Sequence, residues 1–119
     1  MESKELALAC AKILSDKLAQ NLSVLYVREV TTLADYFVLA TGGNSTHVKA
    51  LADEVEFKLK QEEITPDHVE GHGSHSWIVL DYGNVVVHVF SEEARDFYDL
   101  ERLWKDGEKL ELAEIENNE

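Results

Sequence analysis

Residues 77–90 constrain the fold more than any other part of this 119-residue chain. They read WIVLDYGNVVVHVF, two apolar runs rich in branched side chains and separated by a short polar turn. This pattern is typical of a β-hairpin in which Gly83 or Asn84 supplies a positive φ. We therefore predict two paired antiparallel strands here.

The two faces of this hairpin differ in polarity. A two-residue loop, at either Tyr82-Gly83 or Gly83-Asn84, assigns alternate side chains to opposite faces. The apolar face then holds Ile78, Leu80, Tyr82, Val85, Val87 and Val89, and it suits a core beneath helices. The mixed face holds Trp77, Val79, Asp81, Val86, His88 and Phe90. The mixed face is the candidate recognition surface, although a three-residue loop would exchange the two faces.

The first half of the chain shows two helical and two strand patterns. Residues 3–20 have apolar side chains at steps of three and four and predict a helix capped by Ser3. Residues 22–30 and 36–42 predict strands, the second buried on both faces. After the turn GGNS, Ser45 is expected to cap a helix from about Thr46 to Gln61. The apolar stripe of the first helix comprises Leu6, Ala9, Cys10, Ile13, Leu14 and Leu18.

The second half completes an α/β pattern. Residues 66–76 are expected to form a loop or an irregular edge, and Ser91 to cap a helix that runs to Trp104 with Phe97 and Leu100 on its apolar stripe. The order α, β, β, α, β-hairpin, α predicts one α/β domain with a mixed sheet packed by helices. We assign residues 1–104 to this domain and residues 105–119 to a flexible acidic tail.

The balance of acidic and basic residues limits the classes of molecule that the chain can bind. The chain has 24 acidic residues against 11 basic ones, a net charge of −13, which should repel nucleic acid and attract basic protein surfaces. No window resembles the roughly 18 uncharged apolar residues of a membrane span. The N-terminus MESKELALAC does not resemble a secretory signal, so we expect a cytoplasmic protein. Cys10 is the single cysteine, and its helical position predicts a buried thiol.

The sequence patterns that could indicate metal binding or catalysis are weak. The histidines His68, His72, His75 and His88 could wrap a metal, but no cysteine helps them and glycines loosen their loop. His88 is better explained by a neighbour such as Asp81 or by a partner contact than by catalysis. The GGNS turn lacks the Walker lysine, and Asp81 stands alone on its strand, whereas a nucleotidyltransferase needs closely spaced acidic residues. We expect no catalytic residues, no metal and no cofactor.

Two long stretches carry a family resemblance. TTLADYFVLATGGNSTHVKALADEV (residues 31–55) and EGHGSHSWIVLDYGNVVVHVFSEEARDFYDLERLW (residues 70–104) resemble the ribosomal silencing factor family, also called Iojap-like. The resemblance implies a nucleotidyltransferase-like topology without catalysis. It also implies binding to the fourteenth ribosomal protein of the large subunit, a steric block of subunit joining and lower translation when nutrients are short. Thr46 stands where the family usually has an arginine, which leaves open any contact made through that arginine.

The expected partner-binding residues lie on the hairpin and the last helix: Trp77, Val79, Asp81, His88, Tyr98, Glu101 and Trp104. An indole serves an interface or a core equally well, and Asp81 could bind a partner's cation or close its own turn. Two alternatives remain open. One is a metal-dependent nucleotidyl or phosphoryl transferase that uses Asp81, His88 and the GGNS turn. The other is a homodimeric scaffold in which the Trp77 face meets its own copy.

Overall fold

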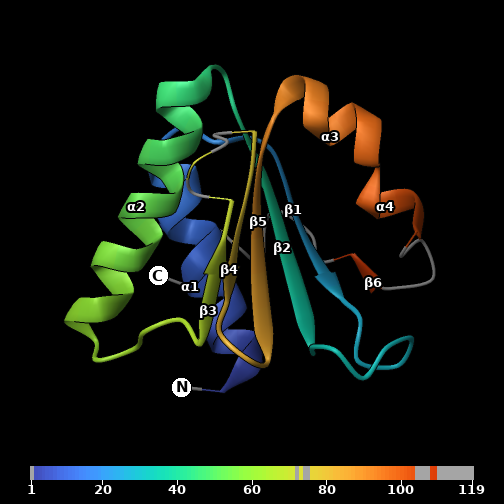
Figure 1. The fold of residues 1–119 in the computed structure, drawn as a ribbon. Coiled ribbons are helices and arrows are strands. Elements are labelled where there is room, and N and C mark those ends of the chain that lie inside the picture. The colour runs from blue at the N-terminus through green and yellow to red at the C-terminus, as the bar shows by residue number, and fades with distance from the viewer. Residues whose placement is uncertain (1, 72, 74–75, 104–107, 110–119) are drawn as a thin grey trace.

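The computed structural model describes residues 2–71, 73, 76–103 and 108–109 (Figure 1). Within these residues a six-stranded mixed sheet has the order β3-β4-β5-β2-β1-β6. The strands are β1 Gln20–Tyr26, β2 Tyr36–Gly42, β3 His68–Glu70, β4 Trp77–Asp81, β5 Val85–Ser91 and β6 Glu108–Lys109. The helices are α1 Ser3–Asp16, α2 Ser45–Gln61, α3 Glu92–Tyr98 and α4 Leu100–Leu103. The predicted α/β class with a mixed sheet is confirmed.

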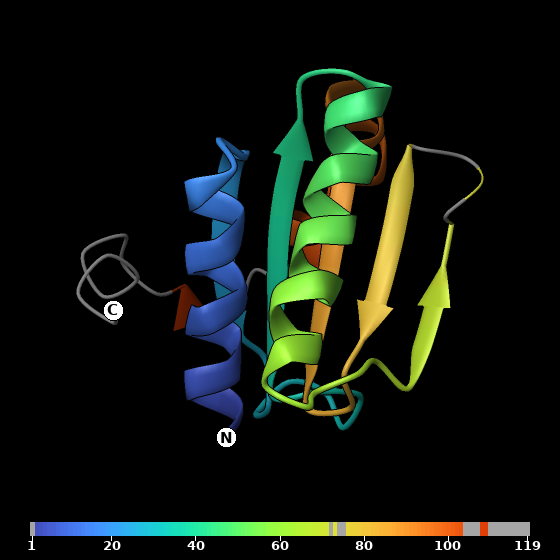
Figure 2. The ribbon, with the colours of Figure 1, turned by 90° about the vertical axis from the view of Figure 1, so that its left-hand side faces the viewer.

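The helices form a layer on each side of the sheet. Helices α1 and α2 cover one face, and the short helices α3 and α4 lie over the other (Figures 1 and 2). Strand β2 is parallel to β5 and antiparallel to β1, and all seven of its residues are buried. A central strand covered on both faces explains its continuous apolar sequence. No helix in the described residues is long and apolar enough to cross a bilayer.

The hairpin has one of the two registers that the sequence allowed for a two-residue loop. The Tyr82 amide donates to the Val85 carbonyl at 2.9 Å, so the loop consists of Gly83 and Asn84. Gly83 has φ of +87°, a conformation that costs little only without a Cβ. The apolar face packs into the core below α1 and α2, and the mixed face packs with a second cluster on the α3 side. The predicted division of side chains between the two faces is confirmed.

The ends of α1 and β1 differ from the prediction. Ser3 lies inside α1, and Glu2 occupies the cap position without a side-chain hydrogen bond. The helix ends at Asp16 because Leu18 turns to φ of 64° and the Ala19 amide donates to the Leu14 carbonyl. Leu18, predicted to face the core, is therefore 79% exposed. Strand β1 stops at Tyr26, since the next residues fold into a turn and not into the predicted extension to residue 30.

The cap of α2 differs from the prediction. Asn44, and not Ser45, caps α2: its Oδ1 accepts from the His47 amide at 2.8 Å.

Of the loop or irregular edge predicted at residues 66–76, the structure shows the edge: β3 is a three-residue edge strand paired with β4. Gly71 ends β3 with φ of +84°, and a Cβ there would lie 1.9 Å from the Trp77 carbonyl oxygen. Only glycine fits this close approach of the chain to β4.

The last predicted helix is divided in two. The Ser91 Oγ accepts from the Ala94 amide at 3.2 Å, which confirms the predicted cap. Asp99 then adopts a left-handed conformation, with φ of 45° and ψ of 55°, and separates α3 from α4. Phe97 does not share a buried stripe with Leu100. Ala94 and Arg95 are the buried residues of α3, Phe97 is 81% exposed, and Leu100 packs against the core. Trp104 lies outside the described residues.

Part of the predicted C-terminal tail belongs to the sheet. Lys109 pairs with Leu25 and Glu108 pairs with Tyr26, which places β6 beside β1. These two residues are therefore in a strand and not in a loose tail. The other residues of the segment 105–119 lie outside the described residues.

Candidate partner-binding surface

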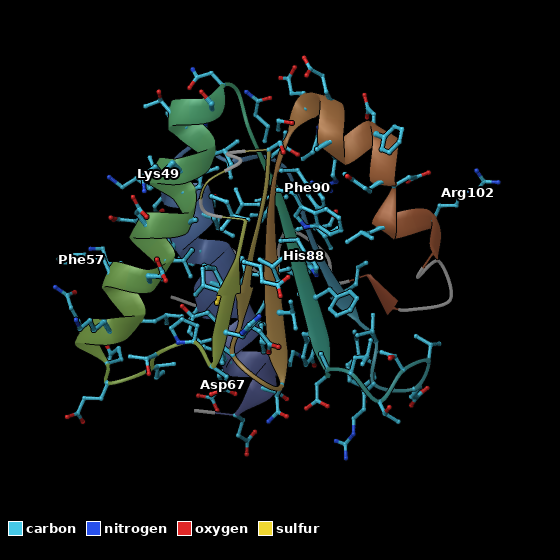
Figure 3. The ribbon with its side chains drawn as sticks, viewed as in Figure 1. Lys49, Phe57, Asp67, His88, Phe90 and Arg102 are labelled. Carbon is cyan, nitrogen blue, oxygen red and sulfur yellow. The ribbon has the colours of Figure 1, made fainter. Side chains whose placement is uncertain are left out.

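The structure brings five of the seven predicted site residues to one side of the sheet. Trp77, Val79 and Asp81 project from β4 and His88 from β5, on the face that α3 and α4 partly cover. Figure 3 shows His88 and Phe90 on this side of β5. Tyr98 reaches the same surface from the end of α3. Glu101 lies in α4 without a described side chain, and Trp104 is outside the described residues.

Trp77 links the sheet to α3. Its ring stacks on Phe90 at 5.1 Å between centroids and lies 4.5 Å from the Tyr98 ring. Its indole N–H donates to the Nδ1 of His88 at 3.1 Å. The side chain remains only half-buried, so Trp77 supports the packing of α3 and also exposes part of its ring. A tryptophan placed in this way combines a structural role with the exposed area that interfaces use.

His88 is a buried, neutral histidine. It is 8% exposed, and burial, together with the nearby Arg95 cation, lowers its pKa to about 4. Because Nδ1 accepts from Trp77, the proton of the neutral ring is on Nε2. Among the described residues, Nε2 has no hydrogen-bond partner, which adds to the cost of charging the ring. His88 therefore fixes the indole and does not itself present a polar group to solvent.

A neighbour does satisfy His88, as predicted, but the neighbour is Trp77 and not Asp81. The Oδ1 of Asp81 accepts from the Gly83 amide at 2.8 Å and closes the hairpin turn. This is the second role that the sequence allowed for Asp81, since a short carboxylate readily binds a backbone amide two residues ahead. A carboxylate offers about four acceptor sites, so one turn contact leaves capacity for a partner's lysine or arginine.

Arg95 was missed by the sequence reasoning. It lies in an acidic helix, yet it is only 7% exposed. Its guanidinium donates to the Oγ1 of Thr41 at 3.0 Å and lies 6.0 Å from the centroid of Phe90. Arg95 thus fixes α3 to β2 and β5. The sequence carried no clear signal for this burial, since Glu92 and Glu93 of the same helix are exposed.

The surface of α3 is acidic and aromatic. Its buried residues, Ala94 and Arg95, face the sheet. The exposed residues of α3 and the following turn are Glu92, Glu93, Asp96, Phe97, Tyr98 and Asp99. This surface adjoins Trp77 through Tyr98. The mixed face of the hairpin and the surface of α3 therefore form one continuous candidate interface.

The residues of the alternative transferase site are not all brought together. The GGNS turn lies beside Ser91 at one end of the sheet, and Asp81 pairs with Val86 about 17 Å along β5. A hollow next to the turn is lined by Glu92 and Glu93, whose charges oppose a bound phosphate. The Gly43 amide already donates to the Nδ1 of His47 at 3.0 Å. The geometry therefore does not favour phosphoryl chemistry at this corner.

The histidines that could have wrapped a metal are also divided between different parts of the fold. His68 pairs with Glu70 at 2.7 Å on the edge strand, whereas His88 contacts Trp77 on the mixed face. His72 and His75 lie outside the described residues. In the part of the chain that the structure describes, no three His, Cys, Asp or Glu side chains are grouped so that they could hold a metal ion. Cys10 is buried in α1, and burial raises the pKa of its thiol to about 12.

The fold and this surface define a class, a small α/β domain with one sheet face closed by long helices and the other partly open and acidic. A family model described as "Ribosomal silencing factor during starvation" matches residues 1–119. The chain belongs to this family, as the sequence resemblance predicted. The ribosomal silencing factor of Chromobacterium violaceum is 37% identical over 113 residues, which cover 95% of this chain and 92% of that protein.

Two further relatives extend the comparison. A crystal structure of a Chromobacterium violaceum protein superposes with a TM-score of 0.85 at 37% identity and covers 93% of this chain and 92% of that one. A mouse protein named "Mitochondrial assembly of ribosomal large subunit protein 1" is 28% identical over 95 residues, which cover 77% of this chain and 42% of the mouse protein. The family and these names associate the chain with ribosome function.

Proposed function

We propose that this protein binds the large ribosomal subunit through the fourteenth ribosomal protein and blocks the joining of the small subunit. It would thereby repress translation in the cytoplasm when nutrients are limiting. The observation that carries the proposal is the single continuous surface of Trp77, Val79, Asp81 and Tyr98 in a chain of the silencing factor family. The name of the mouse relative, which refers to the large subunit, supports the choice of subunit.

The proposed mechanism is steric and electrostatic. A net charge of −13 accelerates association with a basic protein surface and disfavours binding to RNA. Trp77, Val79 and Tyr98 supply apolar contact, and Asp81 accepts from a basic side chain of the partner. His88 acts indirectly, since it holds the indole of Trp77 at 3.1 Å. Glu101 and Trp104 are proposed to extend the contact from the chain after α3.

The first test is co-sedimentation of the protein with isolated large subunits, small subunits and joined ribosomes. We expect binding to large subunits alone and a smaller fraction of joined ribosomes when both subunits are mixed in its presence. Binding to no particle, or equal binding to both subunits, would contradict the proposal. The salt concentration is varied, because contacts between charged surfaces weaken as salt screens them.

Two variants test the surface. Trp77→Ala should weaken binding by about 2 kcal/mol or more. It should also lower the free energy of unfolding, because it removes the contact that supports α3. Urea denaturation therefore measures the folded fraction, and the affinity is expressed per folded molecule.

Asp81→Asn keeps an oxygen for the Gly83 amide and removes the charge, and we expect weaker binding with an unchanged fold. Asp53→Asn on α2 removes the same charge on the far side of the sheet and serves as the matched control. Unchanged affinity in both site variants would exclude this face.

A further inference from the structure

The most exposed large apolar side chain of the described residues lies on α3. Phe97 is 81% exposed and forms an edge contact with Tyr98, with ring centroids 5.1 Å apart at 89°. Tyr98 is 45% exposed and contacts Trp77 at 4.5 Å. Phe97 therefore extends the aromatic row of the mixed face outward. A phenylalanine left in water forgoes about 2 kcal/mol of burial, so exposed aromatic patches often mark binding sites.

Helix α3, which carries Phe97, is attached to the sheet by specific contacts. It is capped by Ser91, held to β2 through Arg95 and Thr41, and ended by the left-handed Asp99. A phenylalanine side chain also has few rotatable bonds, so little conformational entropy is lost when it is bound. The attachment of α3 thus places Phe97 beside the mixed face, where a partner can reach it.

The charges around Phe97 identify the kind of occupant. The exposed charged residues of α3 and its following turn, Glu92, Glu93, Asp96 and Asp99, are all acidic, and they outnumber the exposed Arg102 of α4. The basic residue of this helix, Arg95, is buried against the sheet. Such a surface repels RNA phosphates. It also disfavours a second copy of the chain, because a two-fold contact would oppose acidic groups to acidic groups. A cationic protein surface is the complementary occupant.

We propose that Phe97 enters an apolar hollow bordered by lysine or arginine side chains on a basic ribosomal protein, and that α3 is a recognition element in addition to the hairpin. This inference deepens the proposed function and rests on it. Phe97 was assigned to a core stripe by the sequence pattern, but α3 turns Ala94 and Arg95 to the sheet and leaves Phe97 exposed. The acidic residues around it would form the charged rim of the contact.

The test compares two phenylalanines in large-subunit binding. Phe57 is 57% exposed on α2, on the opposite side of the sheet from α3 (Figures 1 and 3). We expect Phe97→Ala to raise the Kd about tenfold or more and Phe57→Ala to leave it within about twofold. Equal effects of the two substitutions, or wild-type affinity in Phe97→Ala, would overturn the inference. If wild-type protein itself fails to bind large subunits, the proposed function fails first and the inference fails with it.

A second pair of variants tests the occupant. Asp96→Asn with Asp99→Asn removes two charges beside Phe97, and asparagine tolerates the left-handed backbone at position 99. Glu62→Gln with Glu63→Gln removes two charges near the end of α2. We expect a weaker salt dependence of binding in the first double variant alone. Tight binding to protein-free ribosomal RNA would overturn the choice of a protein partner. A dimer in sedimentation that Phe97→Ala dissociates, without a change in subunit binding, would assign the surface to self-association instead.

Discussion

At His88 a titratable ring is kept neutral by its surroundings. The ring projects from β5 and forms an edge contact with Phe37. Its Nδ1 accepts a hydrogen bond from the indole N–H of Trp77. Protonation would place a second donor against that indole N–H, and it would bury a charge near Arg95. The aromatic contacts of Trp77 therefore depend on the neutral form of His88. The indole itself positions Tyr98 on the surface.

This arrangement predicts a pH dependence of stability. The pKa of His88 is lowered from 6.5 to about 4 in the folded state. Between these values the unfolded chain binds a proton that the folded chain does not, so the free energy of unfolding falls as the pH falls. The full loss below pH 4 amounts to about 3 kcal/mol. Urea denaturation at several pH values between 7 and 4 measures it.

The variant His88→Leu isolates this contribution. It loses the acceptor of the indole N–H at every pH, so its stability is lower throughout. The fall in its unfolding free energy between pH 6.5 and 4 should nevertheless be smaller than that of the wild type. Identical pH profiles for the two proteins would show that His88 titrates normally in the folded chain.

At the scale of elements, α3 is the part of the fold that depends most on side-chain contacts. A helix of seven residues is not stable alone in water. Its position is set by the cap at Ser91, by Ala94 against the sheet and by Arg95 on the Thr41 hydroxyl at 3.0 Å. Because the exposed aromatic residues belong to this helix, the stability of α3 and the proposed binding should change together.

Replacement of Thr41 tests the attachment of α3. Thr41→Val keeps the shape of the buried side chain and removes the acceptor for Arg95, so we expect a loss of about 1–2 kcal/mol in unfolding free energy. Amide hydrogen exchange in α3 should become faster than in α2. Thr46→Val, at an exposed position in the first turn of α2, is the control and should change neither quantity. Unchanged exchange in α3 would indicate that other contacts of Arg95 suffice.

For the whole molecule, charge is the dominant property. A net charge of −13 on one small domain disfavours the compact state through self-repulsion. We expect the Tm at pH 7 to rise by several degrees when NaCl is increased from about 10 to 300 mM, because the repulsion is screened. Over the same range the affinity for large subunits should fall. A Tm that falls with salt, measured by thermal scans, would show that favourable ion pairs outweigh the repulsion.

The sequence by itself determined the hairpin and the burial of β2, and it reduced the register of the hairpin to a few possibilities. These features follow from alternation of side chains over a few residues and from a turn that needs Gly83, so they depend only on local geometry. The α/β class follows from the same patterns taken in order. The charge of the chain, and the repulsion of nucleic acid that we infer from it, also needed no structure.

Only the tertiary structure decided how the candidate surface is assembled. Phe97 lies on the outward side of α3, Arg95 is buried on Thr41, and His88 binds Trp77 while Asp81 closes its own turn. The Asn44 cap and the Asp81 turn are local contacts. For Arg95 and His88, by contrast, several partners were chemically equivalent along the sequence. The packing of distant segments selected one of them, because a buried donor or acceptor must be satisfied by whatever group lies within reach.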